Sequence, residues 1–263
     1  NKDIYIFDKI ELICFPIFFS IWIVIHNISP KPKVNNFPKM NTIISDGFCH
    51  ACQYNLIVKY PICFLKNLAE EGDPMAMNSY GMILMEKAKT RFKGIQYIKK
   101  SAKLGDRSAM FNYGYFLYEG KFIQKNKAKA YKYFKLSANL GNINAMYYYA
   151  LMNMMGDEVP KNINNAIYYF KKSADLGNVN SMFSYGSILW INENYKNTTL
   201  AIKYFKKAAD LGHSYSMCNY AAMIYDNKRK LSNIKEAEKY YKMAADKGDS
   251  FLKYHYGMMI LNN

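Results

Sequence analysis

Residues 105–140 read GDRSAMFNYGYFLYEGKFIQKNKAKAYKYFKLSANL, and the chain then repeats this pattern twice without interruption. The second copy is GNINAMYYYALMNMMGDEVPKNINNAIYYFKKSADL over residues 141–176, and the third is GNVNSMFSYGSILWINENYKNTTLAIKYFKKAADL over residues 177–211. Glycines mark the period at spacings of 33 to 36 residues, at Gly72, Gly105, Gly141, Gly177, Gly212 and Gly248. A fixed period of this length predicts stacked helical hairpins.

Each repeat divides into two predicted helices, which we call the first and second helix of a hairpin. In the unit that begins at Gly105, small and apolar residues recur at steps of three and four, which is typical of one helical face. These residues are Ala109, Met110, Tyr113, Gly114 and Leu117. After a polar break at residues 124–127, a second run has the same spacing: Ala130, Tyr133, Phe134, Ser137 and Ala138.

The ends of the second helices carry their own signals. Asn126, Asn162, Asn197 and Asn233 stand just before these helices, where an Asn side-chain oxygen can accept from first-turn N–H groups. Thr90 stands at the equivalent point of the first unit, and the shorter spacing there indicates a deletion in the preceding loop. The period-marking glycine follows each second helix, where a residue of positive φ closes the last turn.

A small residue also recurs in the middle of every first helix. Glycine costs about 0.5–1 kcal/mol relative to alanine inside a helix, so its repetition indicates a close helix–helix contact that a larger side chain would block. The positions are Gly81, Gly114, Ala150, Gly186, Ala221 and Gly257. Alanines and aromatic pairs such as Tyr169–Phe170 and Tyr204–Phe205 in the second helices supply the complementary surface.

Three features together resemble the Sel-one-like repeat (SLR) family, relatives of the tetratricopeptide repeats. They are the pattern Gly-x-x-x-Ala-Met-x-x-Tyr-Gly, the loop of residues 156–166, and the ending Tyr-Phe-Lys-Lys-x-Ala-Asp-Leu-Gly. The resemblance covers residues 68–263. It departs from the family where Tyr113, Tyr149, Tyr185 and Tyr220 replace the usual leucine before the small residue. It implies an α-α superhelix whose first helices line a concave surface.

We therefore expect an all-α fold in two parts. Residues 61–263 form a solenoid of about five to six SLR hairpins, in which residues 61–71 are a second-type helix that caps the array. Residues 1–60 form a separate segment of uncertain structure, with an apolar helix and an irregular linker, and we interpret it as a remnant of a preceding domain.

The apolar run at residues 12–25 has three interpretations. A membrane-spanning helix needs about 20 apolar residues, whereas a run of 10–14 is typical of a core helix, an interfacial helix or a signal segment. A signal peptide would also have a basic start and a small-residue cleavage site, and neither is visible. We favour a buried helix of a preceding domain and leave a membrane anchor and a signal segment open.

The composition favours a folded protein with acidic partners. The apolar fraction is 51% and the formal net charge is +16, most of it on the array. Its lysines cluster in the second helices, as at Lys171–Lys172 and Lys206–Lys207, which indicates a solvated face. No nucleic-acid-binding module is visible, so we do not favour nucleic acid as the partner, although the charge steers acidic molecules toward the chain.

The sequence carries no catalytic pattern. It lacks a phosphate-binding loop, a nucleophile elbow and a metal-binding His-Glu helix, so we expect no enzyme activity and no cofactor. Cys49, His50, Cys52 and Cys63 resemble half of a zinc site, but the second half is missing, and we expect no metal. His213 follows a period glycine and is expected to face solvent. Five irregularly spaced cysteines indicate a reducing compartment.

The predicted function is a non-enzymatic scaffold that binds proteins or peptides on its concave surface. Positions between the packing residues of the first helices are the candidate partner-binding residues: Asn112, Tyr115, Glu119, Tyr148, Leu151, Ser184, Ser187 and Asn219, with Ala222 beside them. Tyr115 and Tyr148 are the favoured anchors, since tyrosine gives a large contact area at low entropy cost. Packing between repeats would explain the same two residues equally well.

Two other functions stay open. The resemblance implies adaptors in signalling and in protein quality control, including ubiquitin-ligase systems linked to the endoplasmic reticulum (ER), and such a role here would require residues 12–25 to insert in a membrane. A basic surface for nucleic acid or anionic lipid is the third alternative, and it predicts binding that weakens steeply with salt. The expected location is the cytoplasm, with the ER or a membrane as the alternative.

Overall fold

The structure of the protein is a computed structural model that describes residues 60–156, 158–226, 231–248 and 250–261. These residues form twelve α-helices and one short 3-10 helix, without strands, so the predicted all-α solenoid is confirmed over the described part of the chain. The first helices are α4 (Pro74–Met85), α6 (Arg107–Glu119), α8 (Ile143–Met155), α10 (Val179–Ile191), α12 (Ser214–Asp226) and α14 (Ser250–Leu261). The second helices are α3 (Tyr60–Glu71), α5 (Arg91–Lys103), α7 (Lys127–Asn139), α9 (Ile163–Asp175), α11 (Thr198–Asp210) and α13 (Leu231–Ala245).

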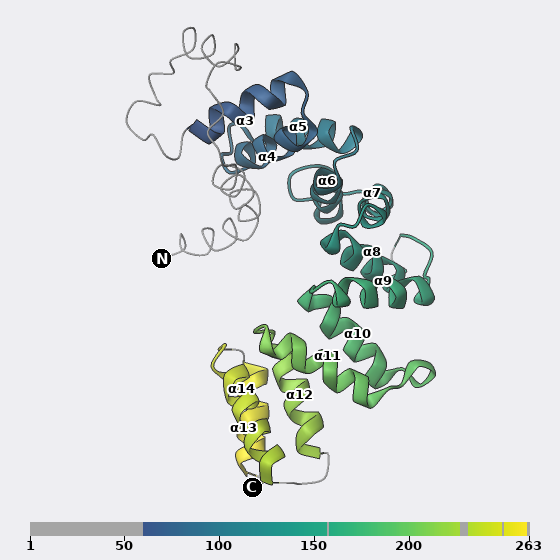
Figure 1. The fold of residues 1–263 in the computed structure, drawn as a ribbon, viewed down its shortest axis with the longest axis vertical. Helices are drawn as coiled ribbons and strands as arrows, with labels where there is room; N and C mark the ends of the chain where they lie inside the picture. The colour runs from purple at the N-terminus through teal and green to yellow at the C-terminus, as the bar shows by residue number, and fades with distance from the viewer. Residues whose placement is uncertain (1–59, 157, 227–230, 249, 262–263) are drawn as a thin grey trace, which may run out of the picture. The chain divides into compact units, whose positions relative to one another are not determined.

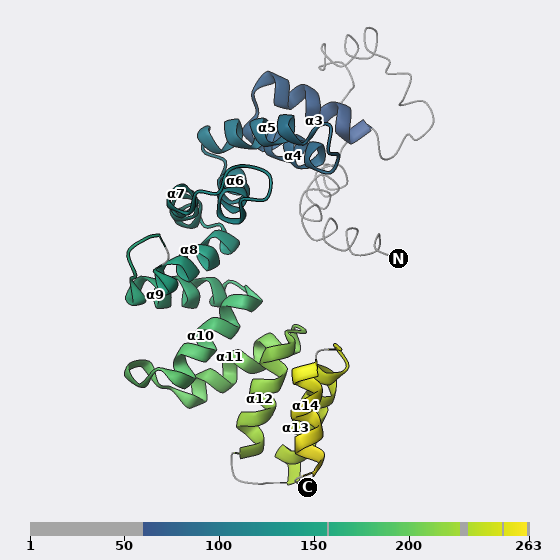
Figure 2. The ribbon, with the colours of Figure 1, turned by 180° about the vertical axis from the view of Figure 1, so that it is seen from behind.

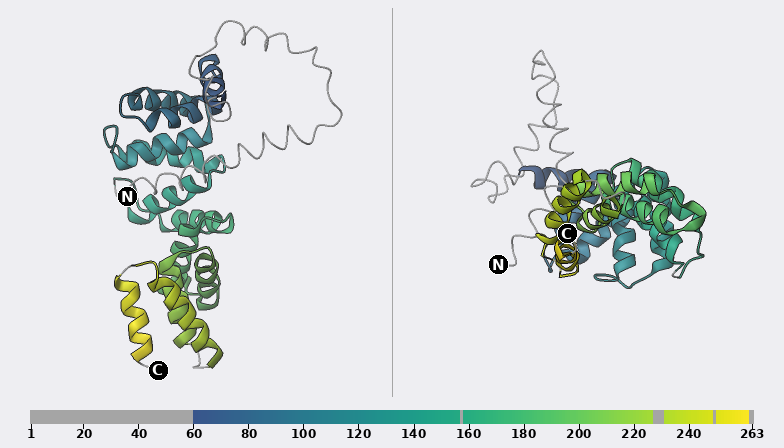
Figure 3. Two further views of the ribbon diagram at one scale, coloured as in Figure 1. Left: turned by 90° about the vertical axis from the view of Figure 1, so that its left-hand side faces the viewer. Right: turned by 90° about the horizontal axis from the view of Figure 1, so that it is seen from below.

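Each helix packs against the helices next to it in the chain. The pairs α4/α5, α6/α7, α8/α9, α10/α11 and α12/α13 are the hairpins, and each second helix also packs on the first helix that follows it. This succession can be followed from α3 to α14 in Figures 1 and 2. Figure 3 shows α14 as the last helix, beside α13. The 3-10 helix η3 (Glu193–Tyr195) lies in the loop before α11.

A link of two to four residues joins each second helix to the next first helix. After α7, the N–H of Gly141 donates to the Ala138 carbonyl and the N–H of Asn142 donates to the Ser137 carbonyl. These two bonds close the helix as a Schellman motif, with Gly141 at φ +86. The Asn142 side chain then caps α8 by accepting from the N–H of Ala145 at 2.9 Å. The predicted role of the period glycine is confirmed.

The asparagine caps are confirmed for three second helices. The side chains of Asn126, Asn162 and Asn197 each accept from the N–H three residues later, at 2.8–2.9 Å. The backbone N–H of each also donates at 2.8 Å to a carbonyl in the last turn of the preceding first helix. The cap residue therefore fixes both the start of its own helix and the geometry of the hairpin loop.

The other two predicted caps are wrong. Thr90 stands before α5, but its hydroxyl donates to the Leu84 carbonyl at 2.8 Å and caps nothing. Asn233 lies inside α13, which begins at Leu231. Thr90 therefore stands at the start of α5, as the alignment predicts, but without a side-chain cap. At Asn233 the aligned position misses the helix start, because α13 begins two residues earlier.

The small residues of the first helices make the predicted close contacts. A Cβ atom at Gly114 would lie 3.1 Å from the Phe134 ring, and one at Gly186 would lie 3.0 Å from the Phe205 ring. The tightest contact joins α4 to α5, where a Cβ at Gly81 would lie 2.7 Å from Ile98 and 2.9 Å from the Gly94 carbonyl oxygen. Gly257 is the exception, because a Cβ there would meet nothing within 4 Å.

A pair of tyrosines recurs in all five hairpins and explains the departure from the family pattern. The rings meet edge to face with centroids 4.9–5.3 Å apart, an arrangement that stabilises aromatic pairs. The pairs are Tyr80–Tyr97, Tyr113–Tyr133, Tyr149–Tyr169, Tyr185–Tyr204 and Tyr220–Tyr240. The first-helix tyrosine replaces leucine because its partner across the hairpin is also aromatic.

The second member of the pair also joins consecutive hairpins. The hydroxyl of Tyr169 donates to Asn139 at 2.8 Å, and that of Tyr204 donates to Asp175 at 2.5 Å. Tyr240 bonds to Asp210 in the same way. Since each acceptor ends the preceding second helix, one side chain contributes to the packing within a hairpin and to the spacing between hairpins.

The first prediction concerns these close contacts. Gly81→Ala should destabilise the fold by about 1–3 kcal/mol, because the new methyl group meets a backbone oxygen that cannot move aside. Gly257→Ala, the matched control in α14, should stabilise it by about 0.5–1 kcal/mol, since alanine favours the helix and has room. Urea denaturation of dilute protein measures both. Equal effects of the two substitutions would contradict the assigned contact.

Candidate functional site

Three aromatic side chains stand at equivalent positions on consecutive first helices, and we call them the aromatic row. Each is partly exposed and rests on a buried phenylalanine of its own second helix. The ring contacts are Phe111 on Phe134 (6.0 Å), Tyr147 on Phe170 (5.9 Å) and Phe183 on Phe205 (6.1 Å). Because the supporting rings are almost fully buried, the aromatic row is held in place before any partner arrives.

Tyr148 is the centre of an aromatic cluster between α6 and α8. Its ring stacks on Phe134 at 5.2 Å and meets Tyr115 at 5.4 Å and Tyr118 at 5.7 Å. Burial raises the pKa of Tyr148 well above its ordinary value, and the neighbouring Tyr115 adds to the shift. Tyr148 is therefore a neutral hydroxyl on a half-buried ring, suited to packing and hydrogen bonding.

The structure brings the two favoured anchors, Tyr115 and Tyr148, into contact, as part of the packing between hairpins. Of the other predicted site residues, Asn112 donates to Asn78 at 2.9 Å, and the Ser187 hydroxyl donates to the Phe183 carbonyl at 2.9 Å. Their hydrogen-bonding capacity is therefore partly used within the array.

The remaining predicted site residues lie on four different first helices. Glu119 is exposed at the end of α6, and Leu151 packs at the edge of the core on α8. Ser184 on α10 and Asn219 on α12 are partly exposed. In the repeat alignment, Asn112, Tyr148, Ser184 and Asn219 share one position, and Tyr115, Leu151 and Ser187 share another. Apart from Glu119, the candidate site is thus two rows of equivalent positions, and its role in binding stays a prediction.

The sequence analysis missed the aromatic row. A signal was available, since Phe111, Tyr147 and Phe183 each follow directly after the Ala-Met or Ser-Met pair of their repeat. The periodicity assigned only the most regular apolar positions to packing and the polar ones to the surface. Partly exposed aromatic residues fall between these two classes, so the pattern alone did not select them.

His213 does not face solvent as expected. It is half-buried before α12, its ring 4.9 Å from that of Phe183, and its Nδ1 accepts from the N–H of Ser216 at 3.1 Å. Burial lowers the pKa of His213 below the ordinary value. The imidazole takes the place of the Asn or Asp that caps the equivalent helices, as Asn142 and Asn178 do.

The lysines of the second helices face solvent, as predicted. Lys171, Lys172 and Lys207 are exposed. Lys206 instead donates to Glu236 of α13 at 2.8 Å and lies over the rings of Tyr220 and Tyr240. The hydrogen bond to Glu236 raises the pKa of Lys206, so this lysine joins α11 to α13.

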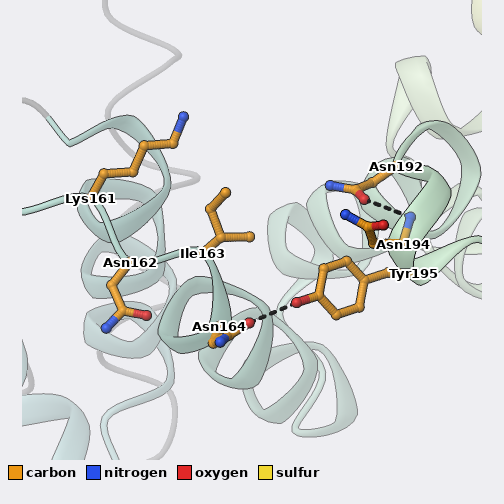
Figure 4. Close-up of a pocket in the computed structure, with 7 residues that line it drawn as sticks. All are labelled: Lys161, Asn162, Ile163, Asn164, Asn192, Asn194 and Tyr195. Carbon is orange, nitrogen blue, oxygen red and sulfur yellow. Dashed lines mark hydrogen bonds between the residues drawn. The ribbon is translucent and has the colours of Figure 1, made fainter.

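A shallow hollow of about 510 Å³ lies between the loops that precede α9 and α11 (Figure 4). Its lining is mostly amide: Lys161, Asn162, Ile163, Asn164, Asn192, Asn194 and Tyr195. The Tyr195 hydroxyl donates to Asn164 at 2.6 Å, which joins η3 to the first turn of α9. The lining side chains are exposed or partly exposed, and the set contains no histidine, carboxylate, serine or cysteine. The hollow has no catalytic constellation.

Several predictions fall outside the described residues. These are the apolar run at residues 12–25 and the cysteines and histidine at residues 49–52, while Cys63 is exposed on α3. In the described part, no group of three or more His, Cys, Asp or Glu residues could hold a metal ion. None of the helices there is both long enough and apolar enough to cross a membrane.

Comparison with known proteins gives one family. The family model described as Sel1 repeat matches residues 91–106, 107–142, 143–178, 194–213 and 214–249, more than half of the chain. The sequence has no match among the curated proteins compared with it.

Two solved structures share the fold. A protective antigen of uropathogenic Escherichia coli with an SLR fold is 23% identical with a TM-score of 0.69, over 75% of this chain and 43% of that one. A Sel1 repeat protein from Oxalobacter formigenes is 21% identical with a TM-score of 0.64, over 72% of this chain and 79% of that one. The chain therefore spans less than half the length of the first of these relatives.

The second prediction concerns the cap of α12. Because burial lowers the folded-state pKa of His213, its stabilising contribution is complete above the unfolded value of about 6.5 and is lost as the pH falls through the folded value. His213→Asn keeps a capping oxygen that does not titrate. The urea midpoint should fall between about pH 7.5 and pH 5.5 in the parent chain, and this fall should be smaller in His213→Asn. An identical fall in both proteins would contradict the assignment.

Proposed function

The chain belongs to the Sel1 repeat family, and we propose that it is a scaffold that binds a segment of a partner protein along its first helices. Sel1 repeat proteins are commonly protein–protein interaction scaffolds and are generally not enzymes. The proposal extends this general role to a particular face of this chain. The face consists of the aromatic row with the flanking positions on α6, α8, α10 and α12.

The observation that carries the proposal is the support of the aromatic row. Phe111, Tyr147 and Phe183 each keep part of the ring exposed while the other side rests on a buried phenylalanine. Ordering such side chains on binding costs little entropy, because they are already fixed. Aromatic side chains in this state are typical anchors of protein interfaces.

The residues beside the row suit a polypeptide ligand. Tyr115 and Tyr148 extend the apolar surface, and Ser184 and Asn219 add groups that can hydrogen-bond a peptide backbone. A partner segment with apolar side chains and exposed backbone groups would match both kinds of position. The formal net charge of +16 supports an acidic partner through steering of the encounter.

The third prediction tests the face by two routes. Tyr115→Ala removes an anchor, and Ser184→Arg places a bulky side chain on α10, in the other row of candidate positions, the row of Tyr148. Each should weaken partner binding by roughly tenfold, about 1–2 kcal/mol. Tyr148→Ala is less suitable, because its ring is part of the packing on Phe134 and its loss would affect the fold. The measurement is co-purification from the source cell, followed by titration of the purified partner.

The controls are matched changes on second helices. Tyr168→Ala removes a ring that is 57% exposed on α9, and Gln96→Arg adds bulk to an exposed position on α5. Both should leave binding unchanged, with circular dichroism confirming the fold of every variant. If Tyr168→Ala abolished binding and Tyr115→Ala did not, the partner would bind the lysine-rich second helices and the proposed face would be wrong.

A further inference from the structure

Phe92 is the most exposed aromatic side chain in the part of the chain that the structure describes, with an exposed fraction of 72%. It lies in the first turn of α5, where the next three second helices carry small or polar residues. These equivalent residues are Ala128, Asn164 and Thr199. The repeat therefore does not require an aromatic side chain at this position, and the exposed ring needs another explanation.

Basic side chains flank Phe92 and continue into the next hairpin loop. Arg91 and Lys93 are its neighbours in sequence, and the Arg91 guanidinium lies over the ring of Phe122 at 4.7 Å. Lys121 lies over the same ring at 5.4 Å. Because Phe122 belongs to the loop between α6 and α7, these contacts place the start of α5 beside that loop. We call residues 86–93 and 120–129 together the basic edge.

The basic edge is much more positive than the equivalent stretches of the next two hairpins. It contains eight Lys or Arg residues and one acid, Glu86, and Glu119 directly precedes its second part. By contrast, residues 156–165 contain one lysine and two acids, and residues 192–200 contain one lysine and one acid. The positive charge is therefore concentrated around Phe92 and Phe122 rather than spread evenly over the hairpin loops.

The chain itself supplies little negative charge to the basic edge. Within the described residues, Lys127 pairs with Glu158 at 4.0 Å, and the other basic side chains of the edge form no ion pair. Residues 1–59 contain six Lys and four Asp or Glu residues, a net charge of +2, and a second copy would bring a formal net charge of +16. Neither has the excess of acids that would complement this surface. The complement is therefore an anionic surface outside this chain.

We propose that the basic edge binds a membrane surface of anionic phospholipids, with the Phe92 ring inserted among the headgroups. Lysine and arginine near such a surface are attracted to it without a fixed geometry, and an aromatic ring at the interface adds apolar burial. The 72% exposure of Phe92 leaves its ring free for this insertion.

Two other kinds of anionic ligand match the basic edge less well. Proteins that bind single-stranded nucleic acid present successive rings on which bases stack, whereas the ring of Phe122 already has the cations of Arg91 and Lys121 over it. Protein interfaces are depleted in lysine, which makes up most of the basic edge. A lipid surface makes neither demand.

The proposed attachment is weak and reversible, because a single ring and a cluster of cations supply it. Its electrostatic part is screened as the salt concentration rises. The residues involved lie in two hairpin loops and in the first turns of α5 and α7. This inference does not depend on the proposed partner-binding face of the first helices.

The fourth prediction compares vesicles of phosphatidylcholine with vesicles that also contain phosphatidylserine, using the full 263-residue chain. In co-sedimentation, the parent chain should bind the phosphatidylserine vesicles at least about tenfold more tightly, and salt should reduce this preference. Phe92→Ser removes the inserted ring, and Lys89→Glu with Lys125→Glu reverses two charges of the edge. Each variant should weaken binding to these vesicles by about tenfold.

Each variant has a matched control in another hairpin. Ile191→Ser removes an apolar side chain that is also 72% exposed, at the end of α10. Lys161→Glu with Lys196→Glu makes the same change of net charge in the loops before α9 and α11. Both controls should bind within about threefold of the parent chain.

A conservative variant reports insertion directly. Phe92→Trp should bind like the parent chain, and brominated phospholipids should quench more of its fluorescence than that of the parent. The parent contains two tryptophans, so the difference between the two chains is the measurement. Equal quenching in both would show that the ring does not enter the membrane.

Three further outcomes would overturn the proposal. Equal binding to both kinds of vesicle, or an equal loss in variants and controls, would place the attachment elsewhere in the chain. Single-stranded oligouridylate that displaces the parent from vesicles, but binds Phe92→Ser weakly, would identify nucleic acid as the ligand. A lower urea midpoint in Phe92→Ser, with unchanged vesicle binding, would mean that residues of the same chain cover this ring.

Discussion

Every regular hairpin of this array depends on the contact between a small residue in the first helix and a large apolar side chain opposite it in the second. Where the small residue is glycine, the second-helix side chain lies within about 3 Å of the missing Cβ atom, as Phe134 does at Gly114. Contacts this close fix the distance between the two helices, because protein interiors tolerate neither overlap nor voids. Capping groups and tyrosine pairs then fix the register of the helices.

The same contact also fixes the positions of aromatic side chains at the surface. Phe134 touches the Gly114 backbone on one side, and its ring supports Phe111 and Tyr148 on the other. Phe205 has the same relation to Gly186 and Phe183. A core residue therefore holds surface aromatics in fixed positions in successive units. This link explains why the candidate binding face repeats with the period of the fold.

The local signals of the sequence were sufficient where a repeat kept its standard length. Asn126, Asn162 and Asn197 could be assigned as caps because each lies at a fixed distance from its glycine. At Thr90 the alignment identifies the helix start but not the missing cap, because the hydroxyl donates to the Leu84 carbonyl instead. At Asn233 the alignment misses the helix start, since α13 already begins at Leu231. His213 was misplaced for another reason. Its burial arises from Phe183, thirty residues earlier in the chain, which a local pattern does not reveal.

The sequence by itself determined the all-α repeat architecture, the two helices of each unit and the residues at their closest contact. These follow from the 33 to 36 residue period, the helical spacing and the positions of small residues, all of which are local in the chain. Only the tertiary structure decided which aromatic side chains stay exposed and which rings support them. Exposure depends on neighbours far away in the chain, as at His213, whose ring lies against Phe183, and a local pattern does not contain them.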